Sequence, residues 1–298
     1  MIRIPFTKAQ GAGNDFLILE ASPKLPLPSA QWRQRLCERH YGVGADGILF
    51  LTIPGTSPGA DADLRIFNRD GGEAEISGNG TRCAAAYLIQ TGRGGPRLAL
   101  QTGAGLKRLT LISQLAYQFL LEMDMGCPIF SPASIPFHPP TRPVSEPVIG
   151  FPLPLSSGPR PVTVTSLGNP HCSTAVEHFQ WDWKALGAEI EQHSFFPNRT
   201  NVEFYRVLSE KEIEVRYWER GVGPTLSSGT GSCAAAVAAI LNKRVQSPVT
   251  VRTPGGPLAV RWEPEGVFLT GPAEIVCQGE FYGREEQPEA PATMALDG

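Results

Sequence analysis

The stretches FNRDGGEAEISGNGTRCAAA (residues 67–86) and WERGVGPTLSSGTGSCAAAV (residues 218–237) are the most informative part of the sequence, because the second repeats the pattern of the first. After a shift of 151 residues, aromatic meets aromatic, arginine meets arginine, and both copies keep a Ser-Gly-x-Gly core. A second echo lies upstream, where Gly13-Asn14 in the first half corresponds to Gly168-Asn169 in the second. Loops that recur in the same order predict two halves of similar structure, as expected of a duplicated domain.

Each Ser-Gly-x-Gly loop precedes an Ala-rich segment that is apolar nearly all round, a pattern typical of a helix buried inside its domain. We expect such helices over 81–90 and 232–242, and a further helix over 29–40. Short alternating or β-branched runs predict strands of antiparallel or mixed sheets. These runs cover residues 16–20, 47–51, 63–67, 97–102, 117–123, 162–166, 212–218, 249–253, 258–262 and 266–270.

The segment between the two halves, residues 127–161, is rich in proline, which sustains neither a helix nor a central strand. We therefore expect an N-terminal domain over residues 1–128, a proline-rich connection over 129–160 and a C-terminal domain over 161–270. Residues 271–298 are expected to form a return strand and a disordered tail, because the last residues are polar and contain proline.

Charge, hydropathy and cysteine spacing exclude several classes of function. The formal net charge is -3 and no long run of Lys and Arg occurs, so a nucleic-acid partner is not expected. The N-terminus, MIRIPFTKAQ, has no apolar signal region and no stretch is apolar enough to span a membrane, so we expect a cytoplasmic protein that binds a small molecule. Six cysteines separated by 44 to 61 residues form no CxxC pair, which argues against a zinc site and a disulfide framework.

Residues 42–47, GVGADG, match the letters of the dinucleotide fingerprint GxGxxG. They follow a predicted helix and lead into a predicted strand, whereas that fingerprint requires a strand followed by a helix. The chain also lacks the GxxxxGK[ST], HExxH and GxSxG motifs. Nucleotide binding, a metalloprotease zinc and a hydrolase nucleophile elbow are therefore not predicted.

The repeated glycine loops suggest a different ligand. A glycine-rich loop that opens a helix offers unbonded backbone N–H groups and the positive end of the helix dipole, so it binds an anion without a charged side chain. Two such loops, one from each half, could hold one carboxylate between them. The alternative is that both loops are tight structural turns.

At these residues the chain resembles the diaminopimelate epimerase family. The resemblance rests on blocks in the family's order and spacing: KAQGAGNDF (8–16), GVGADG (42–47), FNRDGGEAEISGNGTRC (67–83), SLGNPH (166–171), RTNVEF (199–204), ERGVGPTLSSGTGSCAA (219–235) and TGPA (270–273). It implies an α+β fold of two pseudo-symmetric domains, each a β-barrel-like antiparallel or mixed sheet around a central buried helix. It further implies interconversion of LL- and meso-diaminopimelate in lysine and peptidoglycan biosynthesis, with no cofactor and no metal, by a homodimer.

The resemblance also assigns roles to residues of this chain. The family uses asparagine amides around its substrate, which correspond to Asn14, Asn68, Asn169 and Asn201. Arg220 corresponds to the arginine that pairs with the distal carboxylate, while His171 and Glu219 occupy positions that tune the catalytic groups, Glu219 also lying near the substrate. The backbone donors that we expect to bind the α-carboxylate belong to Gly78, Asn79, Gly229 and Thr230.

The chain departs from the family at the two catalytic positions. Inverting a carbon centre needs a base on one face and an acid on the other, and the family uses cysteines before Gly-Asn-Gly and Gly-Thr-Gly. This chain has Ser77 and Ser228 there. A thiol ionises near pH 8.5, whereas a serine hydroxyl needs an adjacent base. Cys83 and Cys233, further along each predicted helix, are expected to be core thiols rather than substitutes.

Three interpretations of the two serines stay open. The chain could be an epimerase in which both cysteines were replaced by serine. It could be a related isomerase or dehydratase that uses Ser77 and Ser228 with His171 as the base. It could also be a catalytically silent homologue that only binds an amino acid.

Overall fold

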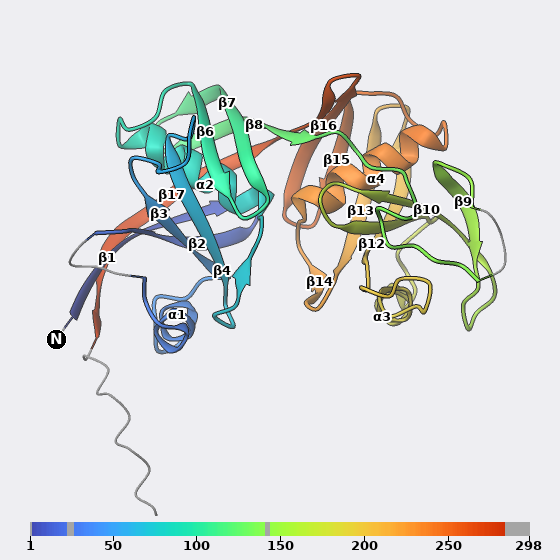
Figure 1. Ribbon diagram of the computed structural model, residues 1–298, viewed down its shortest axis with the longest axis horizontal. Helices are drawn as coiled ribbons and strands as arrows, with labels where there is room; N and C mark the ends of the chain where they lie inside the picture. Colours follow the sequence, from blue (N-terminus) through green and yellow to red (C-terminus); the bar gives the residue numbers. More distant parts are fainter. Residues whose placement is uncertain (1, 23–26, 141–143, 284–298) are drawn as a thin grey trace, which may run out of the picture.

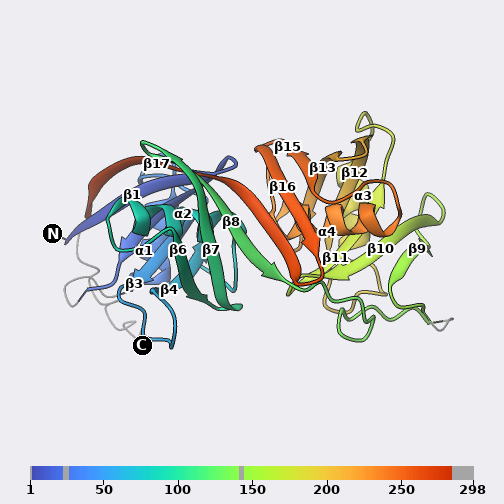
Figure 2. The same ribbon diagram turned by 90° about the horizontal axis from the view of Figure 1, so that it is seen from above.

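In the computed structural model, residues 2–22, 27–140 and 144–283 are described, and the predicted disordered tail after Gly283 lies outside them. Two β-barrels lie side by side, each with a helix through its middle (Figure 1). Two long strands pass between them, as Figure 2 shows for β8 (Gln118–Gly126) and β17 (Gly266–Gly283), which pair antiparallel with each other. The predicted fold of two pseudo-symmetric domains is confirmed.

Eight strands of the described chain close the N-terminal barrel. β1 pairs with both β2 and β17, β8 pairs with both β7 and β17, and the remaining neighbours follow the chain. In addition to β8 and β17, the barrel consists of β1 (Ile2–Gly11), β2 (Asn14–Glu20), β3 (Gly47–Thr52), β4 (Ala62–Asn68), β6 (Arg97–Thr102) and β7 (Gly105–Leu115). A two-residue strand, β5 (Glu73–Ala74), adds to β4.

The C-terminal barrel repeats this order of strands. Its members are β10 (Arg160–Ser166), β11 (Pro170–Ala175), β12 (Asn201–Ser209), β13 (Glu212–Glu219), β15 (Val249–Thr253), β16 (Gly256–Glu263) and the start of β17. The parallel pairs β2–β3 and β4–β6 recur as β11–β12 and β13–β15, and the short strand β14 (Gly223–Thr225) adds to β13 as β5 adds to β4. A bridge between Ile129 and Ser166 joins β10 to the segment that follows β8.

The central helices are α2 (Gly78–Gln90) and α4 (Gly229–Leu241), and both begin three residues before the predicted starts. The reason is the cap, because Ser77 and Ser228 accept hydrogen bonds from the third backbone N–H of their helices, which draws the glycine loop into the first turn. Every residue from Gly78 to Leu88, and every residue of the corresponding part of α4, is buried. The prediction of two buried helices is confirmed.

Other elements differ from the prediction. Helix α1 (Ala30–Cys37) is shorter than predicted, because the Glu38 carboxylate accepts the backbone N–H groups of His40 and Tyr41 and turns the chain. Helix α3 (Trp183–Glu191) was not predicted; it is short, and its core contacts come from only a few residues, among them Leu186 and Ile190. Several strands were not predicted, because they are very short, contain proline, or show no clear apolar alternation. They are β1, β5, β7, β9 (Val148–Leu153), β11, β12 and β14.

The connection between the barrels packs closely against the C-terminal one. Ile135, Phe137, Val148 and Leu153 are buried in a cluster under α3, and β9 pairs with β10 at the edge of the sheet. None of the helices in the described parts of the chain has the length and apolar character needed to cross a membrane.

Candidate active site

The two glycine loops meet where α2 and α4 begin. Gly78 and Gly229 are in contact, so that a Cβ built on Gly78 would lie 3.3 Å from the Gly229 Cα. Each glycine follows the serine that caps its helix, Ser77 or Ser228. The pseudo-symmetry of the fold therefore brings the two Ser-Gly-x-Gly loops to one place between the barrels.

A cavity of about 650 Å³ opens at this junction. Both capping serines line it, together with stretches from either barrel that contain most of the predicted site. The predicted site residues among its lining are Asn14, Asn68, Ser77, Gly78, Asn79, Asn169, Glu219, Ser228, Gly229 and Thr230. The structure thus brings together residues from both halves of the sequence.

The floor of the cavity presents unbonded backbone donors. Ser77 takes the N–H of Gly80 and, through its carbonyl, that of Thr81, while Ser228 does the same for the third and fourth residues of α4. Within the described residues, no acceptor takes the first two N–H groups of either helix, which belong to Gly78 and Asn79 and to Gly229 and Thr230. These four donors lie at the positive ends of two helix dipoles, which makes this part of the cavity a candidate anion site.

The two serines differ in their surroundings. Ser228 is buried and its hydroxyl donates to Glu219 Oε2 over 3.2 Å, while Thr225 donates to the other oxygen of that carboxylate. Burial raises the pKa of the Glu219 carboxyl, and the two hydroxyl donors only partly oppose this. Ser77 is half-buried, and among the described residues its hydroxyl has no carboxylate partner. Only one of the two serines therefore contacts a group that could accept its proton.

His171 lies behind the cavity wall rather than in it. It is fully buried on β11, and its Nδ1 lies 2.6 Å from Glu203 Oε1 while its Nε2 lies 2.8 Å from Asn169 Oδ1. Glu203 also accepts the Ser173 hydroxyl. Because both ring nitrogens are engaged, His171 is connected to the cavity through Asn169, which lines it.

The remaining predicted binding residues fall into two groups. Asn14 donates to Asp46, and Asn68 lies exposed at the rim of the cavity. Asn201 and Arg220 do not line the cavity: the Asn201 side-chain oxygen accepts the Arg220 backbone N–H, and the exposed Arg220 side chain donates to a backbone carbonyl.

Sequence reasoning missed three residues that shape the site. Asp46 holds Asn14, and Glu203 holds His171; both lie inside blocks of the resemblance, and that placement was the available signal. Arg69 corresponds to Arg220 under the 151-residue shift and lines the cavity itself.

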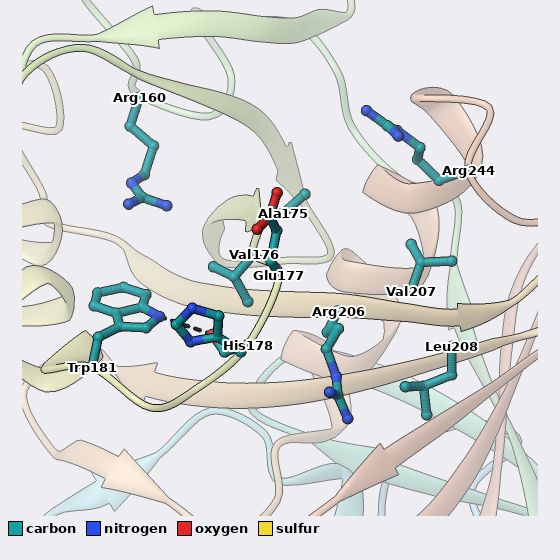
Figure 3. A pocket seen from close by; sticks show the side chains of 10 residues that line it. All are labelled: Arg160, Ala175, Val176, Glu177, His178, Trp181, Arg206, Val207, Leu208 and Arg244. Atoms are coloured by element: carbon teal, nitrogen blue, oxygen red, sulfur yellow. Dashed lines mark hydrogen bonds between the residues drawn. The ribbon is translucent and has the colours of Figure 1, made fainter.

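A larger hollow, of about 890 Å³, lies at the opposite end of the C-terminal barrel (Figure 3). Its polar groups do not converge: in Figure 3 the guanidinium groups of Arg160, Arg206 and Arg244 lie apart from one another around the hollow. Arg160 lies over the Trp181 ring, and Arg206 pairs with Glu214 at 2.6 Å. None of the predicted site residues lines this hollow, so the cavity between the barrels is the better candidate. Nowhere in the described chain do three His, Cys, Asp or Glu side chains gather as metal ligands.

Comparisons with known proteins point the same way as the geometry. The family model described as diaminopimelate epimerase matches residues 6–130 and 163–276. The diaminopimelate epimerase of Pelotomaculum thermopropionicum is 42% identical over 283 residues, covering 93% of this chain and 98% of the relative. That of Acaryochloris marina is 40% identical over 288 residues, covering 94% and 99%.

Solved structures share the fold at much lower identity. A probable proline racemase from Agrobacterium radiobacter matches with a TM-score of 0.66 at 16% identity, covering 97% of this chain and 94% of the other. A methylitaconate-delta-isomerase matches with a TM-score of 0.65 at 15% identity, covering 97% and 99%. At these identities the likeness concerns the fold alone.

Proposed function

The chain belongs to the diaminopimelate epimerase family. We propose that its cavity between the barrels is the site at which LL- and meso-2,6-diaminopimelate are interconverted without a cofactor. One observation carries the proposal: two helix N-termini present to one cavity four N–H groups that no described residue accepts, and Ser77 and Ser228 flank them. The pathway served would be lysine and peptidoglycan biosynthesis.

The geometry suggests how such a site would act. The substrate's α-carboxylate would accept the N–H groups of Gly78, Asn79, Gly229 and Thr230. Its α-carbon would then lie between residues 77 and 228, one removing the proton and the other returning a proton on the opposite face. When the α-proton leaves, charge builds up on the carboxylate, and preorganised donors in a closed site stabilise that charge.

The rest of the predicted set would hold the substrate and tune the site. Asn14, Asn68 and Asn169 line the cavity and can both donate and accept hydrogen bonds. We assign the distal carboxylate to Arg220, held in place by Asn201, whose side chain accepts the Arg220 backbone N–H. Glu219 acts on Ser228 directly, whereas His171 acts through Asn169.

The serines set the expected rate. Ser228 could pass its proton to Glu219, but Ser77 contacts no such base among the described residues, and inversion needs both an acid and a base. We therefore propose low or no turnover for this chain. The lack of a base at Ser77 also favours a second candidate, a homologue that binds the amino acid without converting it. The geometry gives less support to a dehydratase with His171 as base, because both nitrogens of that ring are engaged behind the cavity wall.

Location, assembly and domain limits are part of the same proposal. Every cysteine of the chain is a free thiol, which suits the reducing cytoplasm. A homodimer is supported by exposed apolar side chains on β7 and β17 and in the turn between β7 and β8, among them Ile112, Leu115, Tyr117 and Val276. Sedimentation velocity of the chain and of Leu115→Lys tests the homodimer; a monomeric parent contradicts it.

We keep the limits 1–128 for the N-terminal domain, 129–160 for the connection, 161–270 for the C-terminal domain and 271–298 for the return strand and tail.

The decisive experiment compares this chain with Ser77→Cys/Ser228→Cys in D₂O. LL-diaminopimelate is added, and its epimerisation and loss of α-hydrogen are followed by proton NMR, with binding measured by calorimetry. We expect both proteins to bind the ligand and the double variant to gain epimerisation by several orders of magnitude, because the thiol pair ionises near neutral pH. If the double variant binds diaminopimelate but neither epimerises it nor exchanges its α-hydrogen, a binding role replaces the epimerase proposal.

A further inference from the structure

Arg82, on the second turn of α2, is a fully buried cation without an acidic partner among the described residues. Its Nη2 donates to Asn79 Oδ1 over 2.6 Å and its Nε to the Pro272 carbonyl over 3.3 Å, while its Nη1 has no hydrogen-bond partner within the described chain. A buried, unpaired guanidinium is costly for folding. Because the buried charge of Arg82 does not favour folding, we look for its role in the neighbouring cavity.

The Arg82 guanidinium lies next to Gly78, which lines the cavity between the barrels. A Cβ built on Gly78 would lie 3.8 Å from Arg82 Nη1, and Gly78 is itself in contact with Gly229. On its other side, a Cβ on Gly271 would lie 2.9 Å from Arg82 Cζ, so only glycine leaves room for the group. The charge therefore lies directly behind the wall where the two helix N-termini meet.

No described residue beside Arg82 neutralises it. Burial lowers the pKa of Arg82 to about 10, which still leaves the group charged at neutral pH. The titratable groups whose charge would act on the pKa of Arg82 are the thiols of Cys83 and Cys233. Burial raises the pKa of both thiols, so they stay neutral. The cation is thus free to act on an anion in the cavity.

The repeat places this charge on one side of the site only. Under the 151-residue shift, Arg82 corresponds to Cys233 and its partner Asn79 to Thr230. The two helix N-termini are therefore alike in backbone but different in charge, and the residue at position 77 lies on the charged side.

We propose that Arg82 is the built-in counter-charge of the cavity, a positioning residue that raises the positive potential at the two helix N-termini and holds the Asn79 amide with its oxygen away from the ligand. This rests on the proposed function, because the anion to be stabilised is the α-carboxylate of the amino acid and the charge that develops on it. Among the described residues the guanidinium has no acidic partner. A carboxylate bound at the two helix N-termini, on the other side of Gly78, would supply the missing negative charge.

The first test needs no substrate. Ser77→Cys introduces a thiol, and its pKa is measured from the pH dependence of its rate of alkylation by iodoacetamide, followed for each cysteine peptide by mass spectrometry. The measurement is made in three proteins, which carry Arg82, Arg82→Lys or Arg82→Gln. We expect Arg82→Gln to raise the thiol pKa by about 1 unit, because a cation nearby favours the thiolate. Arg82→Lys, which keeps the charge, should change it much less. The exposed thiols of Cys127 and Cys277 are internal controls and should not respond.

The second test measures ligand affinity by calorimetry with diaminopimelate, in the chain that keeps both Ser77 and Ser228. We expect Arg82→Gln to weaken binding about tenfold, as one pKa unit of interaction implies, and Arg82→Lys to retain most of it. Urea unfolding of all three proteins shows that they are folded and whether Arg82→Gln is as stable as the parent.

The outcomes separate this inference from the function it rests on. If the parent does not bind diaminopimelate, the proposed function fails, and the thiol titration still decides whether Arg82 sets the potential. If Arg82→Gln and Arg82→Lys lose stability alike and the thiol introduced by Ser77→Cys titrates identically in all three backgrounds, Arg82 only supports the packing of α2 against β17, and the inference is overturned.

Discussion

Gly78 and Gly229 are in contact, and a side chain at either position would be crowded: a Cβ built on Gly229 would lie 3.2 Å from the Gly78 Cα and equally close to the Leu269 side chain. This contact joins the two halves of the duplicated fold at their most similar point. It also sets the spacing between the two capping serines, because each serine directly precedes one of these glycines.

Gly229→Ala should therefore separate the two helix N-termini. We expect a loss of about 1–3 kcal/mol in the free energy of unfolding, typical of an added methyl group in a packed site. Urea unfolding measures it, and diaminopimelate affinity should fall as the donors move apart. Gly95→Ala is the matched control, because an added Cβ there meets only one atom, at 3.8 Å, and should change stability by no more than about 0.5 kcal/mol. Equal effects of the two variants would contradict the role of the contact.

Single replacements should reveal the two faces of the site. Ser77→Cys or Ser228→Cys alone provides one group that ionises near neutral pH, whereas inversion needs two. We expect each single variant to exchange the α-hydrogen of one stereoisomer with D₂O, a different stereoisomer for each variant, without accumulating the epimer. Proton NMR of LL- and meso-diaminopimelate reads both. A single variant that epimerises as fast as the double variant would show that only one face needs a thiol.

Glu219→Gln should change how stability depends on pH. Because burial raises the pKa of Glu219, folding favours its protonated form. That contribution is fully present below the ordinary carboxyl range, about pH 4, and is lost as the pH rises through the raised pKa. The neutral, isosteric glutamine should therefore match the parent near pH 4 and exceed it at neutral pH. Urea unfolding across this range provides the check, and parallel curves for the two proteins would rule out an elevated Glu219 pKa.

Arg220→Met should separate ligands by their distal end. We expect diaminopimelate to lose about 2 kcal/mol or more of binding free energy, as when one partner of a charge pair is removed, while lysine, which lacks the distal carboxylate, is little affected. Calorimetry with both ligands measures the difference. Arg69→Met is the comparison, because Arg69 is the repeat partner of Arg220 and lines the cavity. A larger ligand-selective loss in Arg69→Met would move the distal carboxylate to that side.

The two-domain plan of the molecule could be predicted from local sequence patterns. The two Ser-Gly-x-Gly copies and the Ala-rich segments after them predicted two alike halves around buried helices, because burial on all sides and a glycine-opened helix start leave local patterns in the residues. The same patterns placed Ser77 and Ser228 at the two loops, and those loops are where the cavity lies. Helix α3, by contrast, escaped because a short helix with few core residues has a weak local pattern.

Which side chains contact one another in the site depends on tertiary contacts that the local sequence pattern does not contain. Arg82 donates to the carbonyl of Pro272, 190 residues away, Asn201 accepts from Arg220, and His171 turns both ring nitrogens to Glu203 and Asn169 rather than to the cavity. The same holds for the strands β8 and β17, which tie the barrels together through residues remote in sequence. Helix periodicity and caps depend on neighbours within a few residues, whereas charge pairing and desolvation depend on which distant segments the closed barrels bring into contact.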